Sequence, residues 1–243
     1  MRPIAPDDGI RGKRVIVTGA SRGIGAASAR IFSAMGARVG IHCRAGGSAA
    51  QAVSAACPQS RIFEADLSRE GTAGPLLDAF VGWAGGVDIL VNNAGGVPDG
   101  AEAIRTLNLD SPVALVERAW PHFVAGGGGC VVNVSSTVAG RAASARLAEY
   151  AIAKAGLEQA TRNFALAGAP LGIRVNTVRP GIVDTDLNRW ADDPDRTKFA
   201  ARSARVPVGR AARPEEVAAA ILFLAGAMSG YMTGAVLVVA GGE

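Results

Sequence analysis

A tyrosine and a lysine in the second half of the chain are spaced to act together on a proton. The chain holds two tyrosines, and Tyr150 lies four residues before Lys154 in Tyr-Ala-Ile-Ala-Lys. On a helix this spacing brings both side chains to one face. A neighbouring ammonium favours the phenolate, so we expect the pKa of Tyr150 to fall from ~10 toward neutrality. Such a pair gives and takes protons at about pH 7; the alternative is an ordinary exposed helix pair.

A glycine-rich loop near the N-terminus predicts a phosphate-binding site. Thr18-Gly-Ala-Ser-Arg-Gly-Ile-Gly25 follows an apolar run and precedes a helical pattern from Ala26 to Met35. Glycines at such a junction let the backbone approach a pyrophosphate, which the free N–H groups and the dipole of the helix then bind. The spacing alone is a weak signal in a chain with 32 glycines, and a tight strand-to-helix turn is the alternative.

The end of the second apolar run favours NADP(H) over NAD(H). An acid there would accept hydrogen bonds from the 2′-hydroxyl of an adenosine ribose, but the chain has Cys43 followed by Arg44. Together with Arg22 of the glycine loop, Arg44 offers two guanidinium groups to a 2′-phosphate. The alternative is that either arginine is simply solvated.

The elements that must position these residues form an alternating pattern of short apolar runs and longer, alanine-rich stretches of helical period. The seven runs are Arg14–Val17, Arg38–Cys43, Arg61–Ala65, Asp88–Asn92, Cys130–Ser135, Arg174–Arg179 and Val236–Ala240. Continuous apolar runs are typical of a parallel sheet that is buried on both faces. The predicted fold class is therefore α/β, a doubly wound, seven-stranded, Rossmann-like parallel sheet with helices on both faces.

Length and composition predict one domain. The 243 residues, of which 49% are hydrophobic, supply one sizeable core over residues 1–243. The segment at about 184–208 breaks the alternation of strand and helix, and it holds Trp190 and the cluster Asp192-Asp193-Pro194-Asp195. We expect this segment to be a substrate lid.

Composition also limits the partners. No apolar stretch reaches the ~20 residues of a membrane span. The first eight residues end in Asp7-Asp8, where a secretory signal would have its apolar core, so we expect a cytoplasmic protein with no membrane partner. The net charge of +4 comes from scattered arginines, and aromatic residues are 5% of the chain, which argues against nucleic acid. Three separate cysteines and two solitary histidines, His42 and His122, predict no metal site.

Taken together, these motifs resemble the short-chain dehydrogenase/reductase family in its compact branch. The resemblance extends over nearly the whole chain. It rests on the glycine loop, Asp66 in Glu-Ala-Asp-Leu, Asn92-Asn-Ala-Gly95, Asn108, the Ser135-Ser136 pair, Tyr150 with Lys154, Arg179-Pro-Gly181, Thr185 and Gly241-Gly242.

The resemblance implies four catalytic residues. Tyr150 would be the general acid that protonates a carbonyl oxygen as hydride arrives, and the base in the reverse direction. Lys154 would lower the pKa of this tyrosine and hold the ribose hydroxyls of the nicotinamide half. Ser136 would orient the substrate oxygen, and Asn108 would anchor a water in a proton relay toward Lys154; the alternative for Asn108 is a solvent-facing position in a helix.

The resemblance also implies an extended NADP(H) site. Asp66 would meet the adenine, Asn92 and its neighbours would pass beneath the adenine ribose, and Thr185 would hold the carboxamide. Alternatives are a turn or cap residue for Asp66, turn formers for Asn92 and Asn93, and a helix cap for Thr185. The predicted cofactor-binding residues are Gly19, Ser21, Arg22, Gly23, Ile24, Gly25, Arg44, Asp66, Leu67, Asn92, Ala94, Gly95, Tyr150, Lys154, Pro180, Gly181, Val183 and Thr185.

Two departures from the family pattern affect this interpretation. Ser136 lies 14 residues before Tyr150, one more than in many relatives, so Thr137 stands at the more usual distance and Ser136 is favoured without excluding it. The chain ends in Ala240-Gly241-Gly242 where members commonly have Asp-Gly-Gly, which concerns packing more than chemistry.

The substrate expected from the sequence is a free small carbonyl compound or alcohol. The similar 3-oxoacyl-carrier-protein reductases tend to carry arginines that dock an acidic carrier, and the matching positions here are Gly127, Cys130 and Leu171. Arg141, Arg146 and Arg189 offer an alternative, an anionic substrate.

The predicted assembly is a homotetramer, as the resemblance implies. Small residues on the helices expected at Ala101–Ala125 and Ser144–Ala167 permit close contact between copies. A catalytically silent NADP(H)-binding sensor is the alternative function, although Tyr150 and Lys154 are both present.

Overall fold

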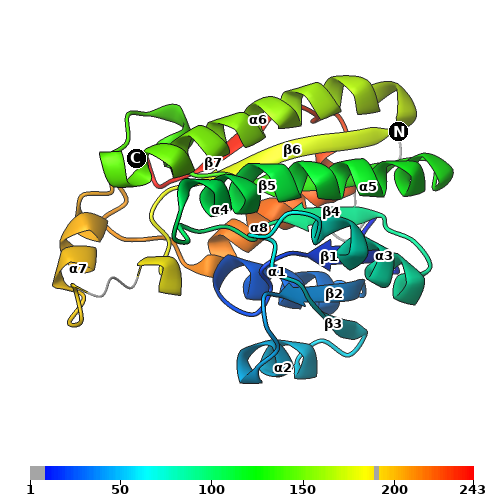
Figure 1. Ribbon diagram of the computed structural model, residues 1–243, viewed down its shortest axis with the longest axis horizontal. Coiled ribbons are helices and arrows are strands. Elements are labelled where there is room, and N and C mark those ends of the chain that lie inside the picture. Colours follow the sequence, from blue (N-terminus) through cyan, green and yellow to red (C-terminus); the bar gives the residue numbers. More distant parts are fainter. Residues whose placement is uncertain (1–8, 189–191) are drawn as a thin grey trace.

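The computed structural model describes residues 9–188 and 192–243, and its centre is a seven-stranded parallel sheet (Figure 1). The strands lie in the order β3-β2-β1-β4-β5-β6-β7. Their bounds are β1 Arg14–Val17, β2 Arg38–Cys43, β3 Ser60–Glu64, β4 Ile89–Asn92, β5 Gly129–Val134, β6 Ile173–Pro180 and β7 Val236–Val239. The predicted fold class is confirmed, and each strand begins and ends within one residue of its predicted position.

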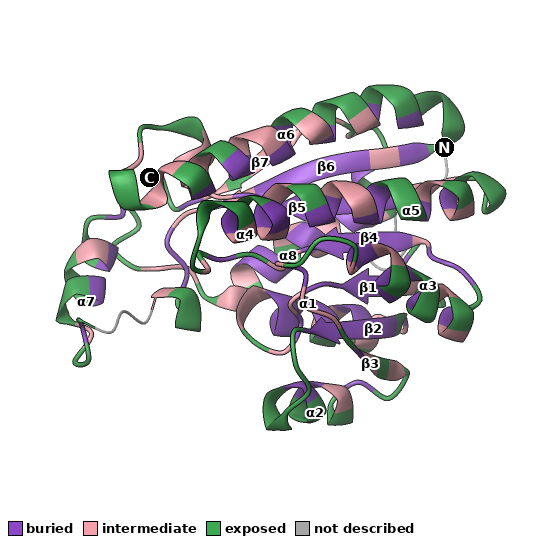
Figure 2. Ribbon diagram, viewed as in Figure 1, coloured by how far each residue is buried: buried purple, intermediate pink, exposed green. Residues whose placement is uncertain are grey.

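Helices cover both faces of the sheet. One face is covered by α1 Gly23–Ala34, α2 Ser48–Ala55 and α8 Pro214–Ala225, and the other by α3 Ala73–Ala84, α5 Ser111–Ala125 and α6 Ala148–Gly168. Side chains of each strand alternate between the two layers: Val15 and Val17 pack under α1 and α8, whereas Ile16 packs under α3 and α5. The five inner strands are therefore buried almost throughout, as Figure 2 shows, which explains their apolar runs, whereas the edge strands β3 and β7 are partly exposed.

A helical irregularity interrupts the long segment predicted at Ala101–Ala125. The segment consists of α4 Ala101–Arg105, a π-helical turn Thr106–Asp110 (η1) and then α5. Pro112, near the start of α5, has no N–H to donate to the carbonyl of Asn108 four residues earlier, so regular α-helical bonding fails there. Such turns are frequent at functional sites.

The chain reverses its winding between β1 and β4. From β1 it proceeds outward to β2 and β3, and from β4 it proceeds in the other direction to β7. The connections that leave the carboxyl ends of β1 and β4 therefore run to opposite faces of the sheet, and open α/β sheets bind ligands at such a point. The remaining elements are α7 Thr197–Ala204 and short 3-10 turns at Thr137–Gly140, Ala145–Leu147, Ala169–Leu171, Asp186–Asn188 and Ala227–Ser229.

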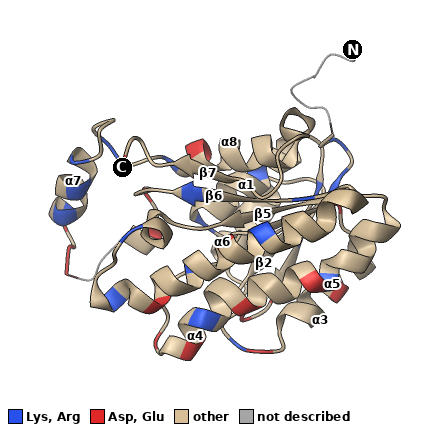
Figure 3. Ribbon diagram, turned by 90° about the horizontal axis from the view of Figure 1, so that it is seen from above, with Lys and Arg blue, Asp and Glu red and all other residues tan. Residues whose placement is uncertain are grey.

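Charged residues are dispersed over the helices (Figure 3). Among the residues that the structure describes, no helix combines the length and apolarity that crossing a membrane requires. Residues 1–8, which include Asp7 and Asp8, lie outside the described residues.

Candidate functional site

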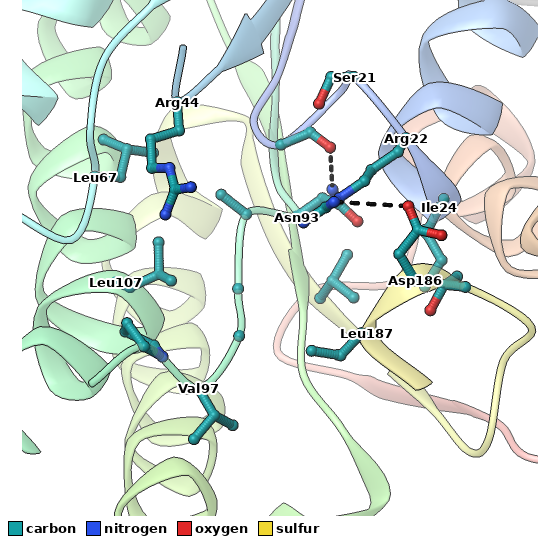
Figure 4. A pocket seen from close by; sticks show the side chains of 18 of the residues that line it. Ser21, Arg22, Ile24, Arg44, Leu67, Asn93, Val97, Leu107, Asp186 and Leu187 are labelled. Carbon is teal, nitrogen blue, oxygen red and sulfur yellow. Dashed lines mark hydrogen bonds and ion pairs between the residues drawn. The ribbon is translucent and has the colours of Figure 1, made fainter. Parts of the chain in front are cut away.

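A cavity of about 590 Å³ lies at the carboxyl ends of the strands, over the switch point between β1 and β4. Figure 4 shows side chains from the glycine loop, the end of β2 and the segment after β6 converging on it. The sequence-predicted residues that line it are Gly19, Ser21, Arg22, Gly23, Ile24, Arg44, Asp66, Leu67, Ala94, Gly95, Ser136, Tyr150, Lys154, Pro180, Gly181, Val183 and Thr185. Residues from seven separate segments of the chain therefore meet at one place.

The glycine loop forms one wall, and its shape fits a phosphate group. Gly19 has φ +64°, and a Cβ there would lie 2.9 Å from the Cα of Ala94. The side-chain amide of Asn93 donates to the Gly19 carbonyl at 3.2 Å and to the Thr18 carbonyl at 2.8 Å, which holds the loop against the end of β4. Helix α1 then begins at Gly23 with no side-chain cap, so its first N–H groups are available to an anion.

Three residues predicted to act directly in the site, Gly25, Asn92 and Asn108, do not line the cavity. Gly25 is a packing position, because a Cβ there would collide with the carbonyl oxygen of Gly19. Asn92 is 1% exposed, and its Nδ2 donates to Oδ1 of Asn133, its partner in the neighbouring strand β5, at 2.9 Å. In a strand, successive side chains alternate between faces, and it is Asn93 that reaches the loop.

Asn108 is the third of these residues. It is fully buried in the π-helical turn, which excludes the alternative of a solvent-facing position. Its Nδ2 donates to the Gly96 carbonyl at 2.8 Å, and its Oδ1 accepts from the Gly96 N–H at 3.1 Å. Asn108 therefore holds the backbone that carries Gly95 and Gly96, both of which line the cavity.

Two arginines, Arg22 and Arg44, line the cavity and come from two different segments of the chain (Figure 4). Arg44 follows β2 and is exposed, next to the buried Cys43. Arg22 Nη1 lies 3.6 Å from Asp186 Oδ2, in the 3-10 turn after β6, with 72% of the Arg22 side chain exposed. Arg22 thus forms an ion pair with Asp186, which the sequence did not predict.

Asp66 is both a turn residue and a residue that lines the cavity. Its Oδ1 accepts from the Ser68 hydroxyl at 2.6 Å and from the Ser68 N–H at 3.1 Å, which is the geometry of a turn residue. The hydroxyl bond lowers the pKa of Asp66, so the carboxylate stays ionised. Asp66 also lines the cavity, beside Leu67.

Tyr150 and Lys154 lie in the first two turns of α6, at the far end of the cavity. They are 9% and 2% exposed, which excludes the alternative of an ordinary exposed pair. The ammonium Nζ lies 5.7 Å from the centre of the Tyr150 ring and donates to the Val134 carbonyl at 2.8 Å. The residues are therefore brought together, with the lysine bonded to the end of β5.

The direction expected for the pKa of Tyr150 is wrong for this arrangement. Burial raises it to about 12, opposed by a hydrogen bond with Ser136. Burial also lowers the pKa of Lys154 to about 8. Desolvation penalises the charged form of both groups, and spacing along a helix carries no information about desolvation.

The structure distinguishes the three hydroxyls at the end of β5. Ser135 is buried, and its Oγ donates to Glu158 Oε1 at 2.7 Å. Glu158 is also bound by Arg179 Nε at 2.8 Å, which connects α6 to the end of β6. Ser136 lines the cavity and bonds to Tyr150, whereas Thr137 begins the next 3-10 turn and does not line it. The geometry favours Ser136.

The segment after β6 closes the other side of the cavity. Thr185 packs against the glycine loop, because a Cβ on Gly23 would lie 3.1 Å from Thr185 Cγ2. The Thr185 carbonyl accepts from the Asn188 N–H at 3.0 Å, which starts the turn Asp186–Asn188. Residues 189–191, with Arg189 and Trp190 of the predicted lid, lie outside the described residues.

Neither of the other two arginines considered for an anionic substrate lines the cavity. Arg141 Nη2 lies 2.9 Å from Glu243 Oε1, and Arg146 is exposed in the loop before α6. Four apolar side chains outside the predicted motifs also line the cavity: Val97, Pro98, Leu107 and Leu187. Leu187 lies in the predicted lid, whereas Leu107 lies in the π-helical turn, which the sequence did not predict.

Comparison with known proteins identifies a matching family and a similar enzyme. A family model described as "Enoyl-(Acyl carrier protein) reductase" matches residues 19–243. Cis-4-hydroxycyclohexanecarboxylate dehydrogenase of Sinomonas cyclohexanicum is 40% identical over 239 residues, which cover 93% of this chain and 94% of that enzyme.

Two solved structures have the same architecture over nearly their full length. A short-chain dehydrogenase/reductase of unknown function from Caenorhabditis elegans, solved with cofactor, has a TM-score of 0.88 and 34% identity, covering 96% of this chain and 95% of that one. A 3-oxoacyl (acyl-carrier-protein) reductase from Agrobacterium tumefaciens with NADP bound has a TM-score of 0.87 and 34% identity, covering 97% and 95%.

Proposed function

This chain belongs to the short-chain dehydrogenase/reductase family, and from that premise we propose that it is an NADP(H)-dependent oxidoreductase that interconverts a carbonyl compound and an alcohol. The observation that carries the proposal is that the buried Tyr150 lines, together with Ser136 and Lys154, the same cavity as an uncapped helix N-terminus. One end of the cavity suits a phosphate, and the other presents a proton donor beside a second hydroxyl.

The glycine loop fits a dinucleotide, as the close approach of Gly19 to Ala94 and the free N–H groups of α1 indicate. Arg44 would bind a 2′-phosphate, and Asp66 with Leu67 would line the adenine pocket. Tyr150 and Lys154 would contact the ribose and nicotinamide half. When bound, NADPH supplies a hydride to the substrate carbon. The NADP bound to the similar Agrobacterium tumefaciens reductase supports this choice of cofactor.

The protein's own residues handle the proton. With a pKa of about 12, Tyr150 holds its proton at neutral pH and donates it to the substrate oxygen, which Ser136 orients by a second hydrogen bond. Lys154, with a pKa of about 8, is mostly charged at pH 7 and stabilises the phenolate left behind. Asn108 acts at one remove, because it fixes the Gly95-Gly96 backbone beside these groups. For this step the bond with Ser136 and the charge of Lys154 must offset the cost of a buried phenolate at Tyr150.

The substrate proposed is a small, free carbonyl compound or alcohol with an apolar body. Val97, Pro98 and Leu187 supply apolar surface near the catalytic end of the cavity. The cationic side chains that line the cavity, among the residues described, are Arg22, Arg44 and Lys154, and all three have roles toward the cofactor. The similar cis-4-hydroxycyclohexanecarboxylate dehydrogenase supports a compact alicyclic alcohol as a first compound to test.

The experiment is NADPH consumption with a panel of a cyclic ketone, a 3-oxoacyl thioester and an enoyl thioester. Turnover of the ketone supports the proposal, and preference for the oxoacyl thioester would replace the free substrate with a carrier-bound one. Turnover of the enoyl thioester alone would overturn the carbonyl chemistry. Tight NADPH binding with no turnover across a broad panel would favour a silent sensor.

We further propose a single-domain, cytoplasmic homotetramer in which the segment at about 184–208 acts as a substrate lid. Exposed apolar side chains on α6, such as Ile152 at 64% and Leu166 at 81%, support contact with another copy. The three cysteines are free and buried, which suits a reducing compartment. Light scattering that gives the 24.6 kDa of one chain at micromolar concentration would contradict the assembly.

A further inference from the structure

His42 is a buried polar residue in an otherwise apolar strand. It lies in β2 with 2% of its surface exposed, and it lines the cavity between the glycine loop and the segment after β3. Its Nδ1 lies 3.0 Å from the Gly19 nitrogen, and its Nε2 lies 3.0 Å from the Ala65 carbonyl oxygen. The imidazole therefore spans the gap between two walls of the cavity.

The partners determine the protonation of the ring. The Gly19 N–H can only donate, so Nδ1 must accept, and the Ala65 carbonyl can only accept, so Nε2 must carry the hydrogen. The ring is thus a neutral imidazole with one defined tautomer, and both of its nitrogens are satisfied. An apolar residue of the same size would leave the Gly19 N–H and the Ala65 carbonyl unpaired, which is costly in a buried place.

Both partners belong to segments that would contact the adenosine half of a dinucleotide. Gly19 is in the left-handed conformation that begins the glycine loop, and the His42 carbonyl also accepts from the Ala20 N–H at 2.7 Å. Ala65 directly precedes Asp66 and Leu67, which line the cavity. The His42 side chain therefore connects the two walls directly, in addition to the backbone bonds that tie Ala20 to His42 and Ala65 to Cys43.

We propose that His42 is a positioning residue for cofactor binding: its neutral ring holds the glycine loop and the Ala65–Leu67 segment at the separation that an adenosine phosphate requires. This inference rests on the proposed dinucleotide function and adds a residue to it. His42 contacts no reacting group, so its loss should weaken cofactor binding and leave the chemical step intact once the site is saturated.

Three substitutions separate the two hydrogen bonds. His42→Phe keeps a flat ring and removes both bonds. His42→Asn places an amide oxygen near the position of Nδ1 and retains an acceptor for Gly19, whereas His42→Gln retains a donor for Ala65. His122→Asn, which changes the other histidine of the chain, in the last turn of α5, is the matched control.

The measurement is the dissociation constant of the full-length protein for NADPH and for 2′,5′-ADP, which carries the adenosine half alone, together with kcat and KM. We expect His42→Phe to weaken both ligands about 10-fold or more, because one or two buried hydrogen bonds are lost, with kcat at saturation within about 3-fold of the parent. His42→Asn and His42→Gln should each recover part of the affinity, and His122→Asn should match the parent.

Unchanged affinity in a folded His42→Phe protein would overturn the role of His42, as would a loss of kcat as large as the loss of affinity. If His42→Phe does not fold, the amide variants decide: affinities for 2′,5′-ADP equal to that of the parent would overturn the proposal, and graded losses would support it. A parent that binds neither NADPH nor 2′,5′-ADP would instead refute the proposed function itself.

Discussion

The two ends of the cavity differ in how their charged groups meet water. At the arginine end, defined by Arg22, Arg44 and Asp186, side chains are exposed, and the Arg22 pair is open to solvent. At the tyrosine end, defined by Ser136, Tyr150 and Lys154, the two titrating groups are buried, and burial moves their pKa values in opposite directions. Charge at the first end follows from residue type alone. Chemistry at the second end depends on desolvation, which only packing determines.

The largest effect expected is that of Tyr150→Phe at the tyrosine end. The substitution removes the hydroxyl that bonds to Ser136 and leaves the ring in place. Turnover should fall by about 10²–10⁴-fold, while NADPH affinity stays within about 3-fold of the parent. Steady-state kinetics with a direct binding measurement test this, and activity near that of the parent at neutral pH would remove Tyr150 from its role.

Lys154→Met should have opposite effects on activity and stability. Turnover should fall about 100-fold or more and cofactor affinity should weaken, because the ammonium is lost. The free energy of unfolding should rise by about 1–3 kcal/mol at pH 7, since a shift of the Lys154 pKa from 10.5 to about 8 reflects the cost of burying its charge. Denaturant unfolding measures this, and a less stable variant would contradict it.

The same pair of proteins gives a pH test. The folded pKa of Lys154, about 8, lies below its unfolded value of 10.5, so between these values the unfolded chain binds more protons. The stability of the parent relative to Lys154→Met should therefore increase as the pH rises from about 8 to 9.5, below the range in which tyrosine titrates. A constant difference over this range would show that the lysine is not desolvated in solution.

Arg44→Ala tests the arginine end, with a smaller effect. A charge-assisted hydrogen bond contributes about 1.5–3 kcal/mol, so the preference for NADPH over NADH should fall by about 10- to 100-fold. Cys43→Asp should move the preference further toward NADH, because it supplies an acceptor for the 2′-hydroxyl and repels a phosphate. The ratio of kcat/KM for the two cofactors is the measurement. A parent that uses NADH as well as NADPH would refute the assignment.

Asp186→Asn should have the smallest effect. It removes the charge that engages Arg22 at 3.6 Å across an exposed surface. Exposed pairs of this kind contribute little, so KM for NADPH should decrease only about 2- to 5-fold as Arg22 becomes free to meet a phosphate. Asp184→Asn, in the same segment, is the control. A large loss of stability or affinity in Asp186→Asn would mean that the two ends of the cavity are less different than the exposures suggest.

Periodicity and motif order were enough to predict the fold. All seven strands lie within one residue of their predicted positions, and the reason is clearest for the five inner strands, where burial on both faces requires continuous apolar runs. The helix predicted from Ser144 begins as a 3-10 turn and becomes α-helical only at Ala148. The sequence analysis also predicted one continuous helix where the structure has a π-helical turn around Asn108. Pro112, which prevents regular α-helical bonding there, is visible in the sequence.

By itself, then, the sequence determined which residue types meet at the switch point: a glycine loop, Arg44 without a neighbouring acid, and Tyr150 four residues before Lys154. These follow from local spacing and strand order. Only the tertiary structure decided that Asn93 rather than Asn92 holds the loop, that Ser136 rather than Thr137 meets Tyr150, and that burial raises the pKa of that tyrosine. The reason is physical: a side chain's face, its partners and its access to water depend on segments that are distant in the chain, and spacing carries no information about them.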